Sequence, residues 1–274
     1  MDFFNSRVVR CEYVCRERVD QISIFATSDK IIVESGDVEN VVISYMECPG
    51  KHEYVLAEEN GTVSLHRKNI VSILWGLYQM FLDSAVKVTV PVGFGGGLVI
   101  KSSSGKTVIS GFNPERINVE CSSGAVKIED VNTGRLDVKS KSGAIKITNL
   151  NSGSDINAGC SSGMLSLINS TAANDISVGT HSGLIRLLNV STGGSVIAGN
   201  KSGAIHIESL KTGGNIDLST VSGAIRGSIA GKESDYSIIS NTTTGYNGLK
   251  NSRNGAKELN ANAKSGAIRI TFME

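Results

Sequence analysis

The amino-acid sequence predicts an all-β fold, a single-chain parallel β-helix (β-solenoid) of about nine coils of about 20 residues each. Three features predict this fold class. A Ser/Thr-Gly pair recurs at a nearly constant interval, apolar residues recur at fixed positions around each glycine, and apolar and polar residues alternate within each repeat. The glycines of the repeat are Gly105, Gly124, Gly143, Gly163, Gly183, Gly203, Gly223, Gly245 and Gly266.

The pattern within the repeat indicates strands that stack. The residue seven places before each glycine is apolar in every repeat, from Leu98 to Leu259. Apolar and polar residues alternate from Leu136 to Ile147, so each repeat is expected to form two or three short strands. One repeat cannot enclose a core, whereas repeats stacked ~4.8 Å apart can. We therefore expect a right-handed stack with equivalent residues above one another.

Small or weakly polar residues lie three places before each glycine, and Ser or Thr directly precedes each glycine. Such a column of hydroxyl groups is compatible with a ligand-binding ladder, but it is also what a tight corner needs, because hydroxyls there bond to backbone. The structural interpretation is favoured. Cys121 and Cys160 share this position two repeats apart, roughly 9 to 10 Å, which is too far for a disulfide, so free thiols are expected.

The N-terminal part repeats only weakly. Residues 1–97 are expected to form an irregular β cap with some first coils, and residues 98–274 the regular solenoid. The segment 69–82 is apolar on all sides and contains the only Trp. It is interpreted as one short buried helix that closes the N-terminal end, with insertion into a membrane surface as the alternative.

Composition argues against several classes of protein. No apolar stretch reaches the ~20 residues that span a bilayer, so no transmembrane segment is expected. The first 20 residues lack the basic-then-apolar order of a secretory signal. The sequence as it stands therefore predicts a cytoplasmic protein, the alternative being the cell surface if a signal has been removed.

Candidate catalytic residues are sparse. Asp137 and Asp217 share an outward position but lie four coils apart, roughly 19 Å, whereas paired carboxylates in glycosidases lie ~5 to 9.5 Å apart. The glycine run Gly93–Gly97 follows Pro91 in an all-β context, which favours a turn over a nucleotide-binding loop. No metal site and no cofactor are expected, and the protein is not expected to be an enzyme. A carbohydrate-active β-helix enzyme is the alternative, and an acidic groove would distinguish it.

One outward position is basic in most repeats. The residue three places after the glycine carries the candidate binding residues Lys127, Lys146, Arg186, His206, Arg226 and Arg269. Such a strip is either a solvated face that also discourages aggregation or a binding site for a polyanionic glycan or envelope polymer such as a teichoic acid. Nucleic acid is disfavoured because no aromatic residue interleaves the strip.

The run from Val86 to Phe112, VKVTVPVGFGGGLVIKSSSGKTVISGF, followed by Ser-Gly-Ala coils, resembles the bacterial putative-adhesin family. This family is a domain of unknown function built as a single-chain β-solenoid, and the resemblance covers roughly residues 20–274. It implies a non-enzymatic binding or scaffold protein associated with the bacterial cell envelope or its stress response, and it supplies no catalytic residue. A protein partner is the other expectation, through the end coil around Ile268, Ile270 and Phe272.

Overall fold

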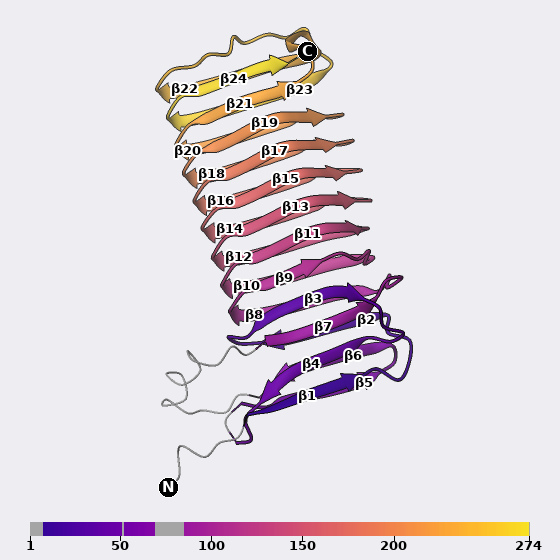
Figure 1. Cartoon of the computed structure of the whole chain (residues 1–274). Helices are drawn as coiled ribbons and strands as arrows, with labels where there is room; N and C mark the ends of the chain where they lie inside the picture. Colours follow the sequence, from indigo (N-terminus) through magenta and orange to yellow (C-terminus); the bar gives the residue numbers. More distant parts are fainter. Residues whose placement is uncertain (1–7, 51, 69–84, 274) are drawn as a thin grey trace.

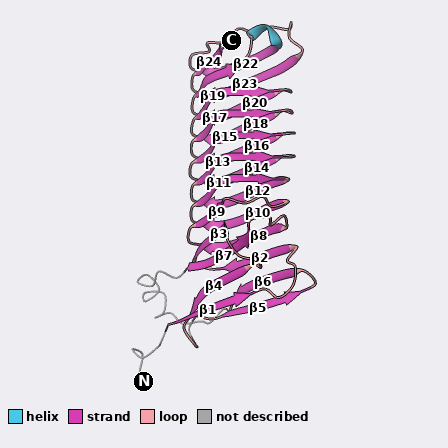
Figure 2. Ribbon diagram, turned by 45° about the vertical axis from the view of Figure 1, so that its right-hand side comes forward, coloured by secondary structure: helices cyan, strands magenta, loops and turns pink. Residues whose placement is uncertain are grey.

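A computed structural model describes residues 8–50, 52–68 and 85–273 as an elongated β-solenoid built from two facing sheets (Figure 1). Figure 2 shows the two sheets side by side along the stack. The described residues contain one short 3₁₀-helix, η1 (Glu233–Asp235), and no α-helix. The segment 69–82, for which a buried helix was predicted, lies outside the described residues. In the described part of the chain, no helix is long and apolar enough to cross a bilayer.

Each sheet contains 12 strands. In spatial order, sheet A consists of β1 (Val9–Val14), β4 (Val42–Glu47), β7 (Ala85–Pro91), β3 (Lys30–Gly36), β9 (Thr107–Ser110), β11 (Val126–Thr133), β13 (Ile145–Ser152), β15 (Leu165–Ala172), β17 (Ile185–Thr192), β19 (Ile205–Thr212), β21 (Ile225–Ala230) and β24 (Ile268–Met273). Sheet B consists of β22 (Tyr236–Thr244), β23 (Lys257–Ser265), β20 (Ile216–Ser222), β18 (Val196–Ser202), β16 (Ile176–Ser182), β14 (Ile156–Ser162), β12 (Arg135–Ser142), β10 (Arg116–Ser123), β8 (Gly97–Ser104), β2 (Gln21–Ala26), β6 (Thr62–Arg67) and β5 (Tyr54–Glu59).

The predicted parallel stacking is confirmed. Most regular coils consist of two strands of seven or eight residues, one in each sheet, joined by the Ser-Gly corner. Leu136 pairs with Ile117 on one side and Ile156 on the other, all fully buried. The alternating apolar residues therefore form continuous columns between the two sheets, and this shared core replaces the core that a single repeat lacks.

The corner explains the invariant glycine of the repeat. Gly143 has φ +140°, and a Cβ built on it would overlap the carbonyl oxygen of Gly124 in the neighbouring coil. Residues three places before the glycine support the corner, as predicted: Thr220 Oγ1 donates to the Gly203 carbonyl at 3.2 Å. Only a residue without a side chain allows successive corners to approach this closely.

Near the C-terminus the stack departs from chain order, contrary to the sequence-based expectation. Strand β23 lies between β20 and β22, so Leu259 pairs with Ile216 while Ile238 lies one coil further out. The reason is that residues 245–256 form no strand of sheet A. Asn247 occupies a position that is apolar in most other coils, and it makes only an isolated bridge to Ile268.

The N-terminal strands extend the same two sheets and are also interleaved. Ile22 of β2 pairs with Val63 of β6 on one side and with Leu98 of β8 on the other. Strands β3 and β7 add to sheet A in parallel in the same way. Beyond them, β1, β4 and β5 pair antiparallel and end the solenoid.

Cys121 and Cys160 both pair in register with Ser140, which places them two coils apart. Both are free thiols, as are the other three cysteines. The prediction from repeat spacing is therefore confirmed.

Adjacent residues of β13 are expected to respond oppositely to the same change. Ile145 is fully buried and Lys146 is exposed. Ile145→Asp places a carboxylate among apolar side chains and should lower the free energy of unfolding by several kcal/mol, about 3 or more. Lys146→Asp should change it by about 0.5 kcal/mol or less. Denaturant unfolding of both variants measures the difference, and equal tolerance would mean that the inward and outward faces are misassigned.

Two glycines should also respond differently to alanine. Gly143→Ala should cost at least about 2 kcal/mol, because the positive φ and the neighbouring carbonyl both oppose a Cβ. Gly159→Ala, in strand β14, should cost about 0.5 kcal/mol or less, since its Cβ would meet only the Gly179 carbonyl oxygen at 3.8 Å. Thermal unfolding checks the pair, and a stable Gly143→Ala protein would contradict the corner explanation.

Candidate functional site

The predicted basic residues lie in one column on the outer face of sheet A, called here the basic ladder. It consists of Lys127, Lys146, Arg186, His206, Arg226 and Arg269, on strands β11, β13, β17, β19, β21 and β24. Lys127 pairs in register with Lys146, and Arg186 with His206. Ser166 of β15 interrupts the column and is buried.

The interleaved strand order near the C-terminus brings the last two ladder residues onto neighbouring strands. Because β24 lies directly beside β21, Arg226 pairs with Arg269 without an intervening coil. The ladder thus spans seven neighbouring strands, roughly 29 Å at ~4.8 Å per strand. The structure brings all six predicted residues together along this length.

Local partners neutralise the ladder only in part. Lys127 Nζ lies 2.6 Å from a carboxylate oxygen of Glu129, and His206 Nε2 lies 4.0 Å from Glu208. Lys146, Arg186 and Arg226 form no ion pair with any described carboxylate. These three side chains therefore present positive charges that no described carboxylate pairs.

Arg269 ends the ladder beside an aromatic ring. Its guanidinium carbon lies 5.5 Å from the centroid of the Tyr246 ring, within the range of a cation–π contact. Tyr246 is exposed and comes from the irregular segment that follows β22. This aromatic neighbour was missed from the sequence because it depends on where the C-terminal segment returns.

A second column on sheet A was also missed. Non-glycine residues with φ near +50° recur on successive strands, and the side chains of the first four bond along the stack; they are Asp130, Asn149, Asn169, Asn189 and Ser209. Asn189 Nδ2 donates to Asn169 Oδ1 at 3.1 Å, and Asn169 to Asn149 at 3.3 Å. Asn adopts this left-handed backbone conformation more readily than most residues do. The column therefore allows each strand to bend at this position. The sequence signal was the recurrence of Asn or Asp six places after the glycine.

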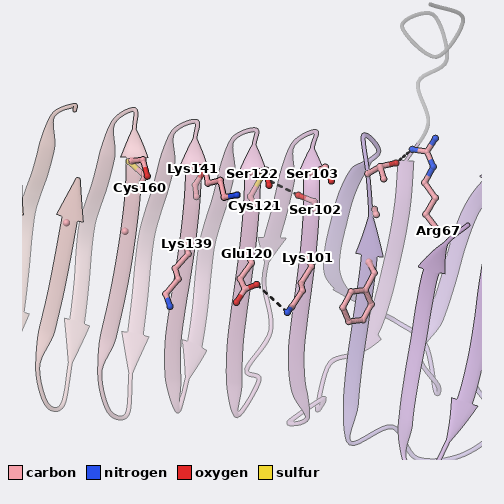
Figure 3. A pocket seen from close by; sticks show the side chains of 17 residues that line it. Arg67, Lys101, Ser102, Ser103, Glu120, Cys121, Ser122, Lys139, Lys141 and Cys160 are labelled. Atoms are coloured by element: carbon pink, nitrogen blue, oxygen red, sulfur yellow. Dashed lines mark hydrogen bonds and ion pairs between the residues drawn. The ribbon is translucent and has the colours of Figure 1, made fainter. Parts of the chain in front are cut away.

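The outer face of sheet B carries a groove of about 860 Å³, called here the sheet B groove. Figure 3 shows Lys101, Glu120 and Lys139 in one row on successive strands, and Ser102, Cys121 and Cys160 in a second row nearer the corner. The row of Lys101, Glu120 and Lys139 continues with Gly159 and Gly179. Since these glycines have no side chains, the floor of the groove there is backbone. No pattern in single repeats pointed to this groove.

An N-terminal cleft of about 640 Å³ contains the acidic residues that the enzyme alternative requires. Its lining includes Glu17, Asp20, Glu39 and Glu115. All four are exposed, and Asp20 forms an ion pair with Arg18 at 3.3 Å. The acid of a catalytic carboxylate pair is normally held in a less polar environment, so this cleft gives the enzyme alternative little support. The run Gly93–Gly97 borders the cleft and begins as a turn, with the Phe94 amide donating to the Pro91 carbonyl at 2.9 Å.

A buried charged cluster lies in the N-terminal part of the solenoid. The Asp29 carboxylate, almost fully buried, lies 3.4 Å from His52 Nε2 and 3.5 Å from the Arg67 guanidinium. Burial lowers the pKa of His52, while Asp29 opposes that effect. Since Asp29 and His52 are enclosed, the cluster acts as an internal ion pair that connects strands. Within the described ranges, no three His, Cys, Asp or Glu side chains are grouped closely enough to hold a metal ion.

The residues predicted for a protein contact at the end coil lie mostly in the core. Ile268 and Ile270 are buried in the core. Phe272 is partly buried, with its ring 5.8 Å from that of Tyr236. These three residues therefore do not form an exposed apolar patch.

Comparisons with known proteins agree with this architecture. A family model described as Toastrack DUF4097 matches residues 19–271. No curated protein shows a significant match to the sequence.

Three solved structures illustrate the likeness in fold. A putative adhesin from Parabacteroides distasonis has 11% identity and a TM-score of 0.61, covering 97% of this chain and 98% of that chain. A putative adhesin from Parabacteroides merdae has 14% identity and a TM-score of 0.53, with 97% of each chain covered. A putative lipid binding protein from Parabacteroides distasonis has 16% identity and a TM-score of 0.56, covering 97% of this chain and 98% of that chain.

Proposed function

Because this chain belongs to the Toastrack DUF4097 family, we propose that it is a non-enzymatic, adhesin-like binding or scaffold protein. The resemblance inferred from the repeats is thereby confirmed, with nearly the whole chain matched. Two of the solved structures of similar fold carry the name putative adhesin, which supports a binding function over catalysis. The proposed place of action is the bacterial cell envelope, and the proposed ligand is a polyanionic glycan or envelope polymer.

The basic ladder is the observation that carries the proposal. Its basic residues occupy six of seven neighbouring strands, which lie about 4.8 Å apart along one face. Exposed single ion pairs contribute little, about 1 kcal/mol or less, but a polymer that meets several charges at once gains from each. A linear polyanion is therefore a better match than a small anion.

The remaining ligand classes fit less well. Base stacking on a nucleic-acid strand requires aromatic residues along the charged path, and Tyr246 stands only at its end. A carbohydrate-active enzyme needs a carboxylate pair in an enclosed cleft, and the carboxylates of the N-terminal cleft are exposed. Binding without turnover is therefore the proposed activity.

Charge reversal along the ladder tests the function. The combined change Lys146→Glu, Arg186→Glu and Arg226→Glu should abolish retention on a teichoic-acid or heparin-like matrix, because it replaces three of the four ladder charges that have no described carboxylate partner. Retention of the unmodified chain should fall steeply as salt rises from ~50 mM, since salt competes for the same contacts.

The matched control is Lys106→Glu, Arg253→Glu and Lys250→Glu, which changes net charge equally at exposed positions off the ladder. This control should retain most of the binding, and both proteins should melt at similar temperatures. Equal loss of retention in both variants would mean that binding depends on net charge alone. An unmodified protein that binds no such matrix at ~50 mM salt would refute the proposed ligand class.

A further inference from the structure

The sheet B groove lies on the opposite face from the basic ladder, and the proposed function does not use it. Its lining comes from seven neighbouring strands, β6, β2, β8, β10, β12, β14 and β16, roughly 29 Å along the axis. A volume of about 860 Å³ lies in the range of ligand sites, yet it is spread along the stack. Such a shape suits a linear molecule of several units.

Charge in the groove is predominantly positive. Lys101 Nζ lies 3.3 Å from a carboxylate oxygen of Glu120, so this pair is neutral as a unit. The next coil contributes Lys139 and Lys141, and neither forms an ion pair with a described carboxylate. In Figure 3 both lysines lie on β12, one in each row. This coil therefore adds two positive charges to the groove that no described carboxylate pairs.

The two ends of the groove favour a sugar chain. At one end the Phe25 ring stacks on His66, with centroids 4.1 Å apart, and offers an apolar surface to the C–H face of a sugar. At the other end Gly159 and Gly179 leave bare backbone, so a ring can lie close to the sheet. Between the ends, hydroxyl and ammonium groups alternate.

We propose that the sheet B groove is a second binding site, specific for a linear acidic oligosaccharide. Lys139 and Lys141 hold its carboxylates, and the sugar backbone extends from Phe25 over the glycine floor. The site is independent of the basic ladder, because the two lie on different sheets of the same coils.

Hexagalacturonate is the probe, and isothermal titration on the full chain gives its affinity. The double change Lys139→Glu and Lys141→Glu should weaken binding at least about tenfold, because it reverses both free charges. Gly159→Tyr should do the same without changing charge, since its side chain fills the floor while its Cβ has room. Amide resonances of Ser140 and Gly159 should shift on titration of the unmodified protein.

Two matched controls separate the groove from the ladder. Lys106→Glu with Lys250→Glu reverses two exposed charges outside both sites, and Ser177→Tyr adds the same bulk as Gly159→Tyr at an exposed position of β16 outside the groove lining. Both should leave hexagalacturonate affinity within about twofold. The groove double variant should in turn keep its retention on the polyanion matrix, so failure of one site is distinguishable from failure of the other.

Three outcomes would overturn the proposal. They are no binding of hexagalacturonate by the unmodified protein, equal binding of neutral maltohexaose, and an equal weakening of hexameric polyphosphate binding by the groove double variant. The second would show that the lysines are not used, and the third that charge is read without the sugar. Loss of binding in Lys146→Glu but not in the groove variants would place the oligosaccharide on the ladder instead.

Discussion

The close approach of one corner backbone to the next is the constraint on which this structure depends. At each corner a glycine with positive φ faces the carbonyl oxygen of the preceding corner, and no side chain fits between them. This contact brings each coil into hydrogen-bonding distance of its neighbour along both sheets. The apolar columns then follow, because coils in register place like residues above one another and close a core that no coil encloses alone.

In-register stacking also determines how the surface is organised. Because equivalent residues stack, a residue type that recurs at one position of the repeat forms a column along the axis. Both candidate sites are therefore linear. Basic residues at one outward position form the ladder on sheet A, while on sheet B a row that changes from lysine and glutamate to glycine forms a groove. The same regularity that builds the core therefore favours ligands that are themselves repetitive polymers.

Much of the fold could be predicted from the sequence because its cause is local. The glycine period, the apolar columns, the outward basic column and the free thiols of Cys121 and Cys160 all follow from spacing alone. The order of the last coils could not be predicted, since it depends on Asn247 and the segment around it failing to continue sheet A. The groove could not be predicted either: Lys139, Gly159 and Gly179 are ordinary residues singly, and their alignment appears only after the chain is stacked.

The interleaved coils at the two ends have a consequence for how the chain assembles during synthesis. Strand β2 leaves the ribosome before either of its neighbours in sheet B, because β6 and β8 are encoded later. Strand β2 can complete its pairing only after both neighbours have been synthesised. At the other end, β23 must insert between β20 and β22, although β22 is synthesised first. The middle coils can add one after another as they appear, whereas each end requires a long-range closure. Synthesis from the N-terminus can therefore add the middle coils in chain order, whereas strands at the two ends pair out of chain order.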